Sequence, residues 1–142
     1  MRRVVLMALC LFVAAAAPVR AAENATGTWR MSNGKVTVRL APCGAALCGR
    51  VVGLKKPLDS EGHAKLDRKN PDPALRGRPV IGLTILSNMR ASGPGKWSGT
   101  IYNPDDGKTY SSSMQLLGAS SMKVNGCVAG VLCKSLKFTR VQ

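Results

Sequence analysis

The feature that most constrains the fold is a series of short segments with alternating or β-branched residues, separated by turn sequences. Residues 36–40 (Val-Thr-Val-Arg-Leu) alternate apolar and polar side chains, as a strand with one buried face does. No stretch after Ala22 shows convincing helical periodicity. About eight short strands joined by tight turns predict an all-β barrel or sandwich. The expected strands cover residues 26–31, 35–41, 47–54, 79–86, 96–102, 108–116, 121–125 and 134–141.

One connection is much longer than the others. Residues 55–78 show no clear strand pattern and carry Pro57, Pro71 and Pro73. A connection of this length in a compact domain is usually functional or mobile. We expect either a solvated surface loop or a lid over one end of a barrel. Its seven basic residues are Lys55, Lys56, Lys65, Arg68, Lys69, Arg76 and Arg78, and its four acidic residues are Asp59, Glu61, Asp67 and Asp72.

The first 21 residues are expected to be a secretory signal peptide. Arg2 and Arg3 precede an apolar stretch at residues 4–17, and small residues surround the expected cleavage site at Ala21. That stretch is shorter than the roughly 20 residues of a membrane span, and no later segment is long enough. We therefore expect a single domain at residues 22–142, periplasmic or secreted, with no transmembrane segment in the mature chain.

Four cysteines remain after the expected signal peptide, and an even number in an exported chain predicts disulfides. The spacing favours two local pairs, Cys43 with Cys48 and Cys127 with Cys133. Long-range pairing remains open at this point. A four-cysteine zinc site is the other alternative, although its usual C-x₂-C spacing is missing.

The chain is strongly basic, with 21 Lys and Arg against 7 Asp and Glu and a formal net charge of +14. Such a charge suits an anionic partner, or it simply maintains solubility. Anionic lipid, lipopolysaccharide or an acidic polymer of the envelope fits an exported protein. Nucleic acid is not expected, because few aromatic side chains are free to stack on bases.

No coherent catalytic set emerges, so the sequence leans against an enzyme, and no cofactor is expected. His63 is the only histidine and is expected to be an exposed loop residue. Asp67, Asn70 and Asp72 could offer oxygens to Ca²⁺, but the basic residues between them would repel the ion. We interpret this stretch as turn chemistry around two prolines and predict no metal site.

Gly27-Thr28-Trp29 at the first expected strand and Arg140 on the last resemble the signature of lipocalin-like (calycin) barrels. In that family the indole closes one end of the barrel and the basic residue packs across it. The resemblance implies a small antiparallel up-and-down β-barrel of about eight strands, with Gly27, Trp29 and Arg140 forming the barrel closure. Arginine over an indole face also gains cation–π attraction, and the contact would join the first strand to the last.

A fuller pattern is similar to a family of exported bacterial proteins catalogued as domain of unknown function 2147. The resemblance covers nearly all of residues 26–142. It implies a small β-barrel and a periplasmic or secreted location, and the family has no assigned activity. The matching segments are residues 43–50 (Cys-x₄-Cys-Gly-Arg), 69–73 (Lys-Asn-Pro-Asp-Pro), 75–79, 97–110, 126–127 and 139–141.

Our first functional hypothesis is that the barrel binds a small or lipid-like anionic ligand in or near its mouth. Arg76 and Arg78 would hold an anionic head group, and Tyr102 and Tyr110 would hydrogen-bond it. The alternative is a filled, non-catalytic structural or interaction protein that docks on the envelope or on another protein through its basic surface. Apolar residues expected to line the barrel are Val36, Val38, Leu40, Ile81, Leu83, Ile85 and Ile101.

Overall fold

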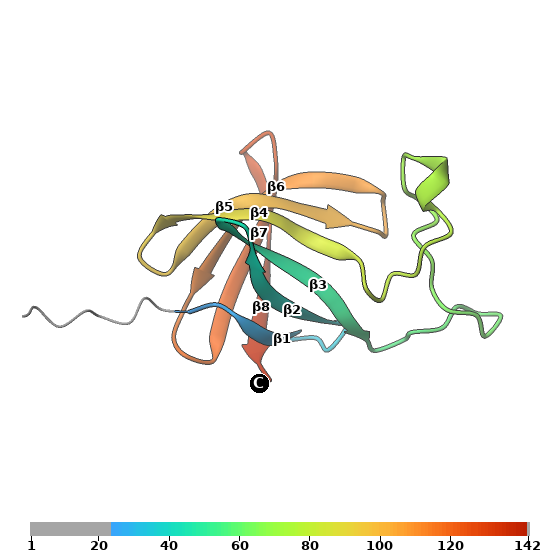
Figure 1. The fold of residues 1–142 in the computed structure, drawn as a ribbon, viewed down its shortest axis with the longest axis horizontal. Helices are drawn as coiled ribbons and strands as arrows, with labels where there is room; N and C mark the ends of the chain where they lie inside the picture. The colour runs from blue at the N-terminus through green and yellow to red at the C-terminus, as the bar shows by residue number, and fades with distance from the viewer. Residues whose placement is uncertain (1–23, 142) are drawn as a thin grey trace, which may run out of the picture.

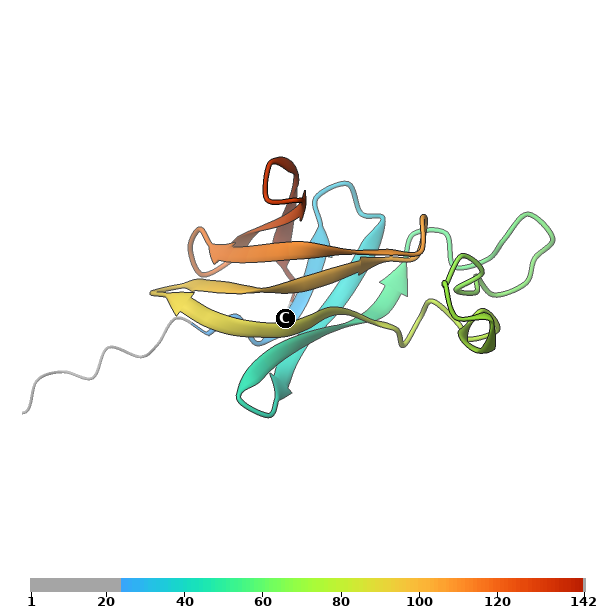
Figure 2. The ribbon, with the colours of Figure 1, turned by 90° about the horizontal axis from the view of Figure 1, so that it is seen from above.

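The computed structural model describes residues 24–141, in which eight antiparallel strands form a closed barrel in sequence order (Figures 1 and 2). Each strand pairs with its neighbours in the chain, and β8 pairs back with β1. The strands are β1 (Gly27–Met31), β2 (Val36–Cys43), β3 (Ala46–Leu54), β4 (Thr84–Gly93), β5 (Lys96–Asn103), β6 (Lys108–Leu116), β7 (Ser121–Val128) and β8 (Leu132–Arg140). This is the all-β up-and-down barrel that the sequence predicts. The expected signal peptide at residues 1–21 lies outside the described residues.

The connections alternate between two ends of the barrel. One end carries the turns at residues 44–45, 94–95 and 117–120, together with the start of β1 and the end of β8. The other end carries the turns at residues 32–35, 104–107 and 129–131 and the long connection at residues 55–83 (Figure 1). We call these the closed end and the mouth. Within residues 24–141, no helix is long and apolar enough to cross a membrane.

Trp29 and Arg140 lie together at the closed end. The indole is fully buried, and its Nε1 donates to the Ala25 carbonyl at 2.8 Å. The Arg140 guanidinium carbon lies 4.2 Å from the centroid of the indole ring. The same guanidinium donates to the carbonyls of Thr26, Asn24 and Ala119 at 2.6, 2.8 and 2.8 Å. These contacts join β1, β8 and the turn before β7 where β1 and β8 pair over only three residue pairs.

Apolar side chains fill the barrel interior. Because side chains alternate along each strand, every second residue points inward. The buried cluster includes Trp29, Val38, Leu40, Val51, Leu86, Met89, Met114, Met122, Val124 and Phe138. Of the residues expected to line a cavity, Val38, Leu40, Leu83 and Ile85 are buried in this core, and Val36 and Ile101 pack against it. Ile81 is the exception, because it lies in the long connection and is 44% exposed.

The fourth strand lies further along the chain than residues 79–86, where the sequence pattern placed it. β4 starts at Thr84 and continues to Gly93. Its register with β5 shifts between Ser87 and Arg90, and Asn88 within this bulge has a φ of 53°. An extra residue in the strand breaks the alternation, which hid the second half of β4 from pattern analysis. The long connection therefore spans residues 55–83.

Two disulfides join Cys43 to Cys48 and Cys127 to Cys133. This is the local pairing that the cysteine spacing favours, and it replaces both the long-range and the zinc alternatives. Each bond lies across a hairpin, Cys43–Cys48 at the closed end and Cys127–Cys133 at the mouth. Cys127 and Cys133 are direct partners in the β7–β8 ladder, so their bond holds the two strands together just below the turn.

The long connection has internal structure. Two isolated β-bridges join Leu58 to Ala64 and Leu66 to Pro79, and a single 3-10 turn, η1, covers Pro73–Leu75. Asp72 caps η1 by accepting from the Ala74 amide at 3.0 Å. The connection lies beside the mouth at the right of Figures 1 and 2.

Candidate functional site

A polar cluster at the mouth fastens the long connection to β5. Its centre is Asp67, whose side chain is fully buried. The Tyr102 hydroxyl donates to Asp67 Oδ1 at 2.6 Å, and Asn70 Nδ2 and Arg78 Nε donate to Oδ2 at 2.8 and 3.0 Å. The Tyr102 side chain also packs against the buried cluster of the barrel. The connection is therefore anchored to β5 at the edge of the core.

Electrostatics favours the charged form of Asp67. Burial on its own would raise the pKa of this carboxyl, but the hydrogen bonds from Tyr102, Asn70 and Arg78 outweigh it, and the pKa is lowered. Tyr102 shifts the other way, because burial and the hydrogen bond to the Asp67 carboxylate raise its pKa. The cluster at neutral pH is thus an ionised Asp67 paired with Arg78, with Tyr102 protonated.

The β5–β6 turn packs against the same connection. Gly107 has a φ of 71°, and a Cβ at this position would lie 1.8 Å from the Lys69 carbonyl oxygen. Arg76 Nε donates to the Asn70 carbonyl at 2.7 Å, which fixes the chain next to Lys69. Residues 69–73 and 103–107, two separate segments of the sequence pattern, therefore meet at the mouth.

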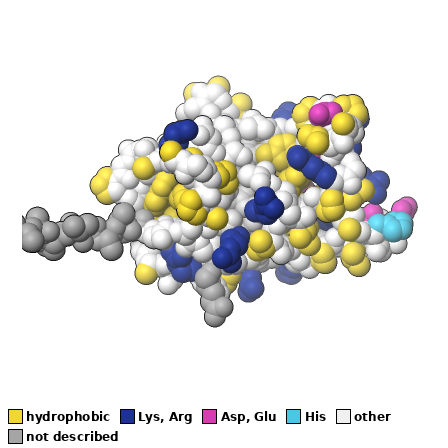
Figure 3. Space-filling model, in the orientation of Figure 1, with side chains coloured by type: hydrophobic (Ala, Val, Ile, Leu, Met, Phe, Trp, Pro, Cys, Tyr) yellow, Lys and Arg dark blue, Asp and Glu magenta, His cyan; other side chains and the backbone are white. Residues whose placement is uncertain are grey.

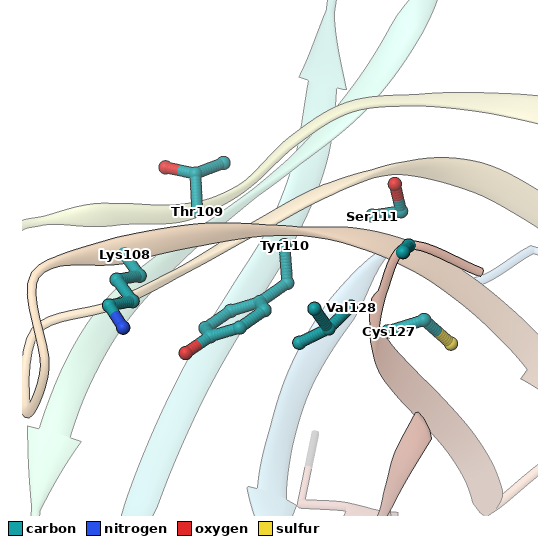
Figure 4. Close-up of a pocket in the computed structure, with 7 residues that line it drawn as sticks. Lys108, Thr109, Tyr110, Ser111, Cys127 and Val128 are labelled. Carbon is teal, nitrogen blue, oxygen red and sulfur yellow. The ribbon is translucent and has the colours of Figure 1, made fainter. Parts of the chain in front are cut away.

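A groove of about 470 Å³ opens between β6 and β7 at the mouth. The two strands pair from Leu116 and Met122 as far as Ser111 and Cys127, and their pairing ends there. In Figure 4, Lys108, Tyr110 and Val128 point to one side of β6, and Thr109 and Ser111 point to the other. The groove is lined by Lys108, Thr109, Tyr110, Ser111, Cys127, Val128 and Ala129.

Tyr110 contributes an aromatic ring to this groove, and its hydroxyl is hydrogen-bonded by a residue that does not line the groove. The hydroxyl donates to Asp106 Oδ2 in the adjacent turn. That hydrogen bond raises the pKa of Tyr110 and lowers the pKa of Asp106. Tyr110 is thus a protonated, oriented side chain, and Lys108 is the cationic group beside it in the groove lining.

A second groove, of about 400 Å³, lies at the closed end. Pro42, Leu47, Met89 and Trp97 are among its lining residues, so its walls are largely apolar. None of the four residues expected to bind ligand lines this second groove. We therefore centre the candidate site on the mouth.

The structure divides the four expected ligand-binding residues into two groups. The first group belongs to the polar cluster and donates hydrogen bonds to residues of the long connection; it consists of Arg76, Arg78 and Tyr102. The second group is Tyr110 alone, which lines the groove. Ligand binding by these residues stays a prediction. Lys108 and Val128 were not singled out from the sequence. The sequence signal that could have identified them is their position, since Lys108 directly follows the Gly107 turn and Val128 directly follows Cys127.

A cluster of three side chains also lies at the exposed far end of the long connection. Metal-ligating atoms of Asp59, Glu61 and His63 lie within 4.8 Å of one another. His63 Nδ1 is 3.6 Å from Glu61 Oε2, and Arg68 Nη2 is 3.4 Å from Asp59 Oδ2. His63 is an exposed loop residue, as expected, with a side chain 70% exposed. The sequence analysis did not single out its two acidic neighbours, which the Asp-x-Glu-x-His spacing could have suggested. The adjacent arginine competes with any cation for Asp59.

Comparisons with known proteins agree with this architecture. The model of a family described as an uncharacterised protein conserved in bacteria (DUF2147) matches residues 27–140. Among solved structures, protein HP1028 from Helicobacter pylori, described as belonging to the lipocalin family, is similar with a TM-score of 0.69. The two chains share 22% identity, and the match covers 82% of each. The comparison with curated proteins finds no match. Because the family model covers most of the sequence, this chain belongs to the uncharacterised bacterial family DUF2147, and its fold is a lipocalin-like barrel.

Proposed function

We propose that this protein binds a small amphipathic anion, of fatty-acid type, in the groove between β6 and β7. The observation that carries the proposal is the groove itself, which opens at the mouth where the pairing of the two strands ends. The interior below it is occupied by core side chains. A ligand would therefore lie along the groove between the strands and not at the bottom of the barrel.

The groove lining matches both parts of such a ligand. The Tyr110 ring and the half-exposed Val128 side chain offer apolar surface to an alkyl chain. Lys108 supplies a cation for a carboxylate or phosphate. Buried Ser112, two residues beyond Tyr110 on the same face of β6, has a hydroxyl with no hydrogen-bond partner among residues 24–141. Ser112 is not among the groove-lining residues, so this hydroxyl lies below the proposed ligand and is not part of the site.

We place the polar cluster around Asp67 in a supporting role. Its arginine and tyrosine side chains already hydrogen-bond within the protein, and they hold the long connection beside the mouth. The proposed site therefore keeps Tyr110 from the sequence-based set and adds Lys108 and Val128. The expected signal peptide supports the further proposal that binding takes place in the periplasm or outside the cell, and the two disulfides are compatible with that compartment.

Calorimetric titration with dodecanoate and with uncharged dodecanol tests this site. We expect saturable binding of both, with dodecanoate the tighter ligand. Lys108→Ala should weaken dodecanoate by up to about fivefold, the value of an exposed ion pair, and leave dodecanol unchanged. Tyr110→Ala should weaken both ligands.

Lys96→Ala is the matched control, because it removes an exposed lysine from the closed-end start of β5. Absence of saturable binding for both ligands would refute the proposal. If Lys96→Ala and Lys108→Ala lowered the affinity for dodecanoate equally, the groove would not be the binding site.

A second candidate function is docking on an anionic surface without a small ligand. The observation that favours it is the excess of basic residues, 21 Lys and Arg against 7 Asp and Glu.

A further inference from the structure

The turn between β7 and β8 presents apolar side chains to solvent. Val128, Val131 and Leu132 are 53%, 82% and 75% exposed. Between the two disulfide-bonded cysteines, the sequence Val-Ala-Gly-Val-Leu contains no polar side chain. Figures 1 and 2 show this hairpin (red) projecting beyond the neighbouring strands, away from the long connection. Contiguous exposed apolar surface of this kind marks an interaction site more often than a scattered residue does.

The backbone conformation of the turn favours a polar residue at position 129, where this chain has alanine. Ala129 has a φ of 51° and Gly130 a φ of 68°, so both central residues are in the left-handed region. Turns of this shape favour Asn or Asp followed by Gly, because most side chains are strained at positive φ. This chain instead has alanine at the strained position, which keeps the turn apolar.

The hairpin is also held in shape before it meets any partner. The Cys127–Cys133 disulfide joins two directly opposed residues of the ladder, and only the Val128–Leu132 pair lies between this bond and the turn. A cross-linked hairpin loses less conformational freedom on binding than a flexible loop does.

Basic side chains follow the apolar turn along the hairpin, with Lys134 nearest to it and Lys123 and Lys137 farther away toward the closed end. From residue 107 to the last residue, the sequence has five basic residues and no acidic one. Lys134 follows the disulfide, and Lys123 faces Lys137 across the β7–β8 ladder. Like charges at opposed positions destabilise a sheet, so this arrangement opposes folding. In Figure 3 the visible acidic side chains lie at the right, over the long connection, while basic side chains extend across the barrel.

We infer that the β7–β8 hairpin docks this protein on a lipid bilayer that contains anionic lipids. Val131 and Leu132 enter the interfacial region with Val128 at its edge, and Lys134, next to the disulfide, binds the lipid head groups while Lys123 and Lys137 add longer-range attraction to the anionic surface. An apolar insertion combined with basic residues supplies the two signals that stable peripheral binding needs. Three side chains cover far less than the roughly 800 Å² per partner of a standard protein interface, which disfavours a second copy as the occupant.

This inference goes beyond the proposed ligand site and does not depend on it. The hairpin and the groove are neighbours, because Val128 and Ala129 line the groove. Val131 and Leu132 are not among the groove residues, so substitutions at these two positions test the docking alone.

Flotation with vesicles of phosphatidylcholine, with and without phosphatidylglycerol, tests the docking. We expect binding to the anionic vesicles and little binding to phosphatidylcholine alone. The double variant Val131→Ser with Leu132→Ser should lower the affinity for anionic vesicles by about tenfold, because it removes the apolar insertion. Lys134→Ala with Lys137→Ala should weaken binding, and added salt should weaken it further.

The control is Leu58→Ser with Leu117→Ser, which removes two exposed apolar side chains elsewhere on the surface, 53% and 50% exposed. It should bind like the unchanged protein. The changed side chains are exposed, so we expect each variant to fold with a melting temperature close to that of the unchanged protein. Thermal unfolding of each variant checks this.

Three results would overturn the inference: no binding to anionic vesicles, unchanged binding by the serine double variant, or concentration-dependent self-association that this variant abolishes. The second result would mean adsorption by charge alone, and the third would make a second copy the occupant. Titration with dodecanoate in the absence of vesicles reports on the groove, so the two proposals can fail separately.

Discussion

Arg140 combines two interactions that a different cation could not reproduce. Its planar guanidinium lies over the Trp29 indole and, at the same time, donates to three backbone carbonyls from the segment before β1 and from the turn before β7. Lysine has no planar group for stacking and presents its donors from a single atom. The sequence signature is thus explained by a specific geometry at the closed end.

We predict that Arg140→Lys lowers the free energy of unfolding by about 2 kcal/mol, from reduced cation–π attraction and lost hydrogen bonds. Urea unfolding followed by circular dichroism measures this difference. Arg39→Lys, an exposed arginine on β2, should change stability little and serves as the control. Equal stability of the two variants would mean that Arg140 does not hold the closed end.

Asp67 should make stability depend on pH at the acid end of the range. Its pKa is lowered in the folded protein, so its contribution is present above the unfolded pKa of about 3.9 and is lost as the pH falls through the folded value. Asp67→Asn should cost roughly 1–3 kcal/mol near neutral pH, because Arg78 loses its charged partner.

The difference in unfolding free energy between Asp67→Asn and the unchanged protein should then narrow at about pH 3. This comparison isolates Asp67 from the other aspartates, Asp59 and Asp106, whose pKa values are also lowered. Asp105→Asn controls for loss of a carboxylate in an exposed turn. A difference that does not change with pH would contradict the assigned ionisation.

At the scale of elements, the long connection depends on how closely the β5–β6 turn approaches it. Gly107→Ala would place a methyl group 1.8 Å from the Lys69 carbonyl, so the connection or the turn must move. Gly34 offers a matched control, because its φ is +73° and nothing lies within 4 Å of an added Cβ. Both variants share the cost of positive φ, about 1 kcal/mol, and only Gly107→Ala has the clash.

We therefore predict that Gly107→Ala increases trypsin cleavage within residues 55–78 and that Gly34→Ala does not. Limited proteolysis with mapping of the cut sites measures this, since the connection carries seven basic residues. Similar cleavage of the two variants would show that the contact with Lys69 does not hold the connection.

The elements that follow a simple alternation could be predicted from the sequence, and the others could not. Residues 36–40 show the pattern of β2 directly. The bulge at Asn88 shifts by one residue which side chains of β4 point into the barrel. The pairing of Val128 with Leu132 extends β7 and β8 into a stretch of sequence without alternation. Local pattern therefore located the strands better than it located their ends.

The candidate site was harder to predict because it depends on where two strands separate. Tyr110 was recognised as a polar aromatic near a turn, and the structure places it in the groove. The hydrogen bonds of Arg78 and Tyr102 to a buried Asp67 required the folding of the connection onto β5, which no local pattern encodes.

The whole molecule has two unlike ends around a filled interior. At the closed end, Trp29 and Arg140 seal the barrel, and at the mouth β6 and β7 separate and leave a groove. Stability therefore resides mainly in the core, while both proposed interactions use the mouth. Changes to the exposed side chains of the groove and of the β7–β8 turn should alter binding more than they alter folding.

The two disulfides belong to the hairpins, and the apolar contacts belong to the core. Both disulfides close short loops, with sequence separations of 5 and 6, so chain entropy gives each about 2 kcal/mol. Neither bond crosses the core, whose apolar contacts remain after reduction. We expect reduction of both bonds to lower the free energy of unfolding by about 4 kcal/mol while the far-ultraviolet circular dichroism spectrum stays that of a barrel. Urea unfolding with and without a reductant measures the loss, and Cys43→Ser with Cys48→Ser separates the two bonds. Loss of the β spectrum on reduction would mean that the disulfides, and not the filled core, hold the barrel together.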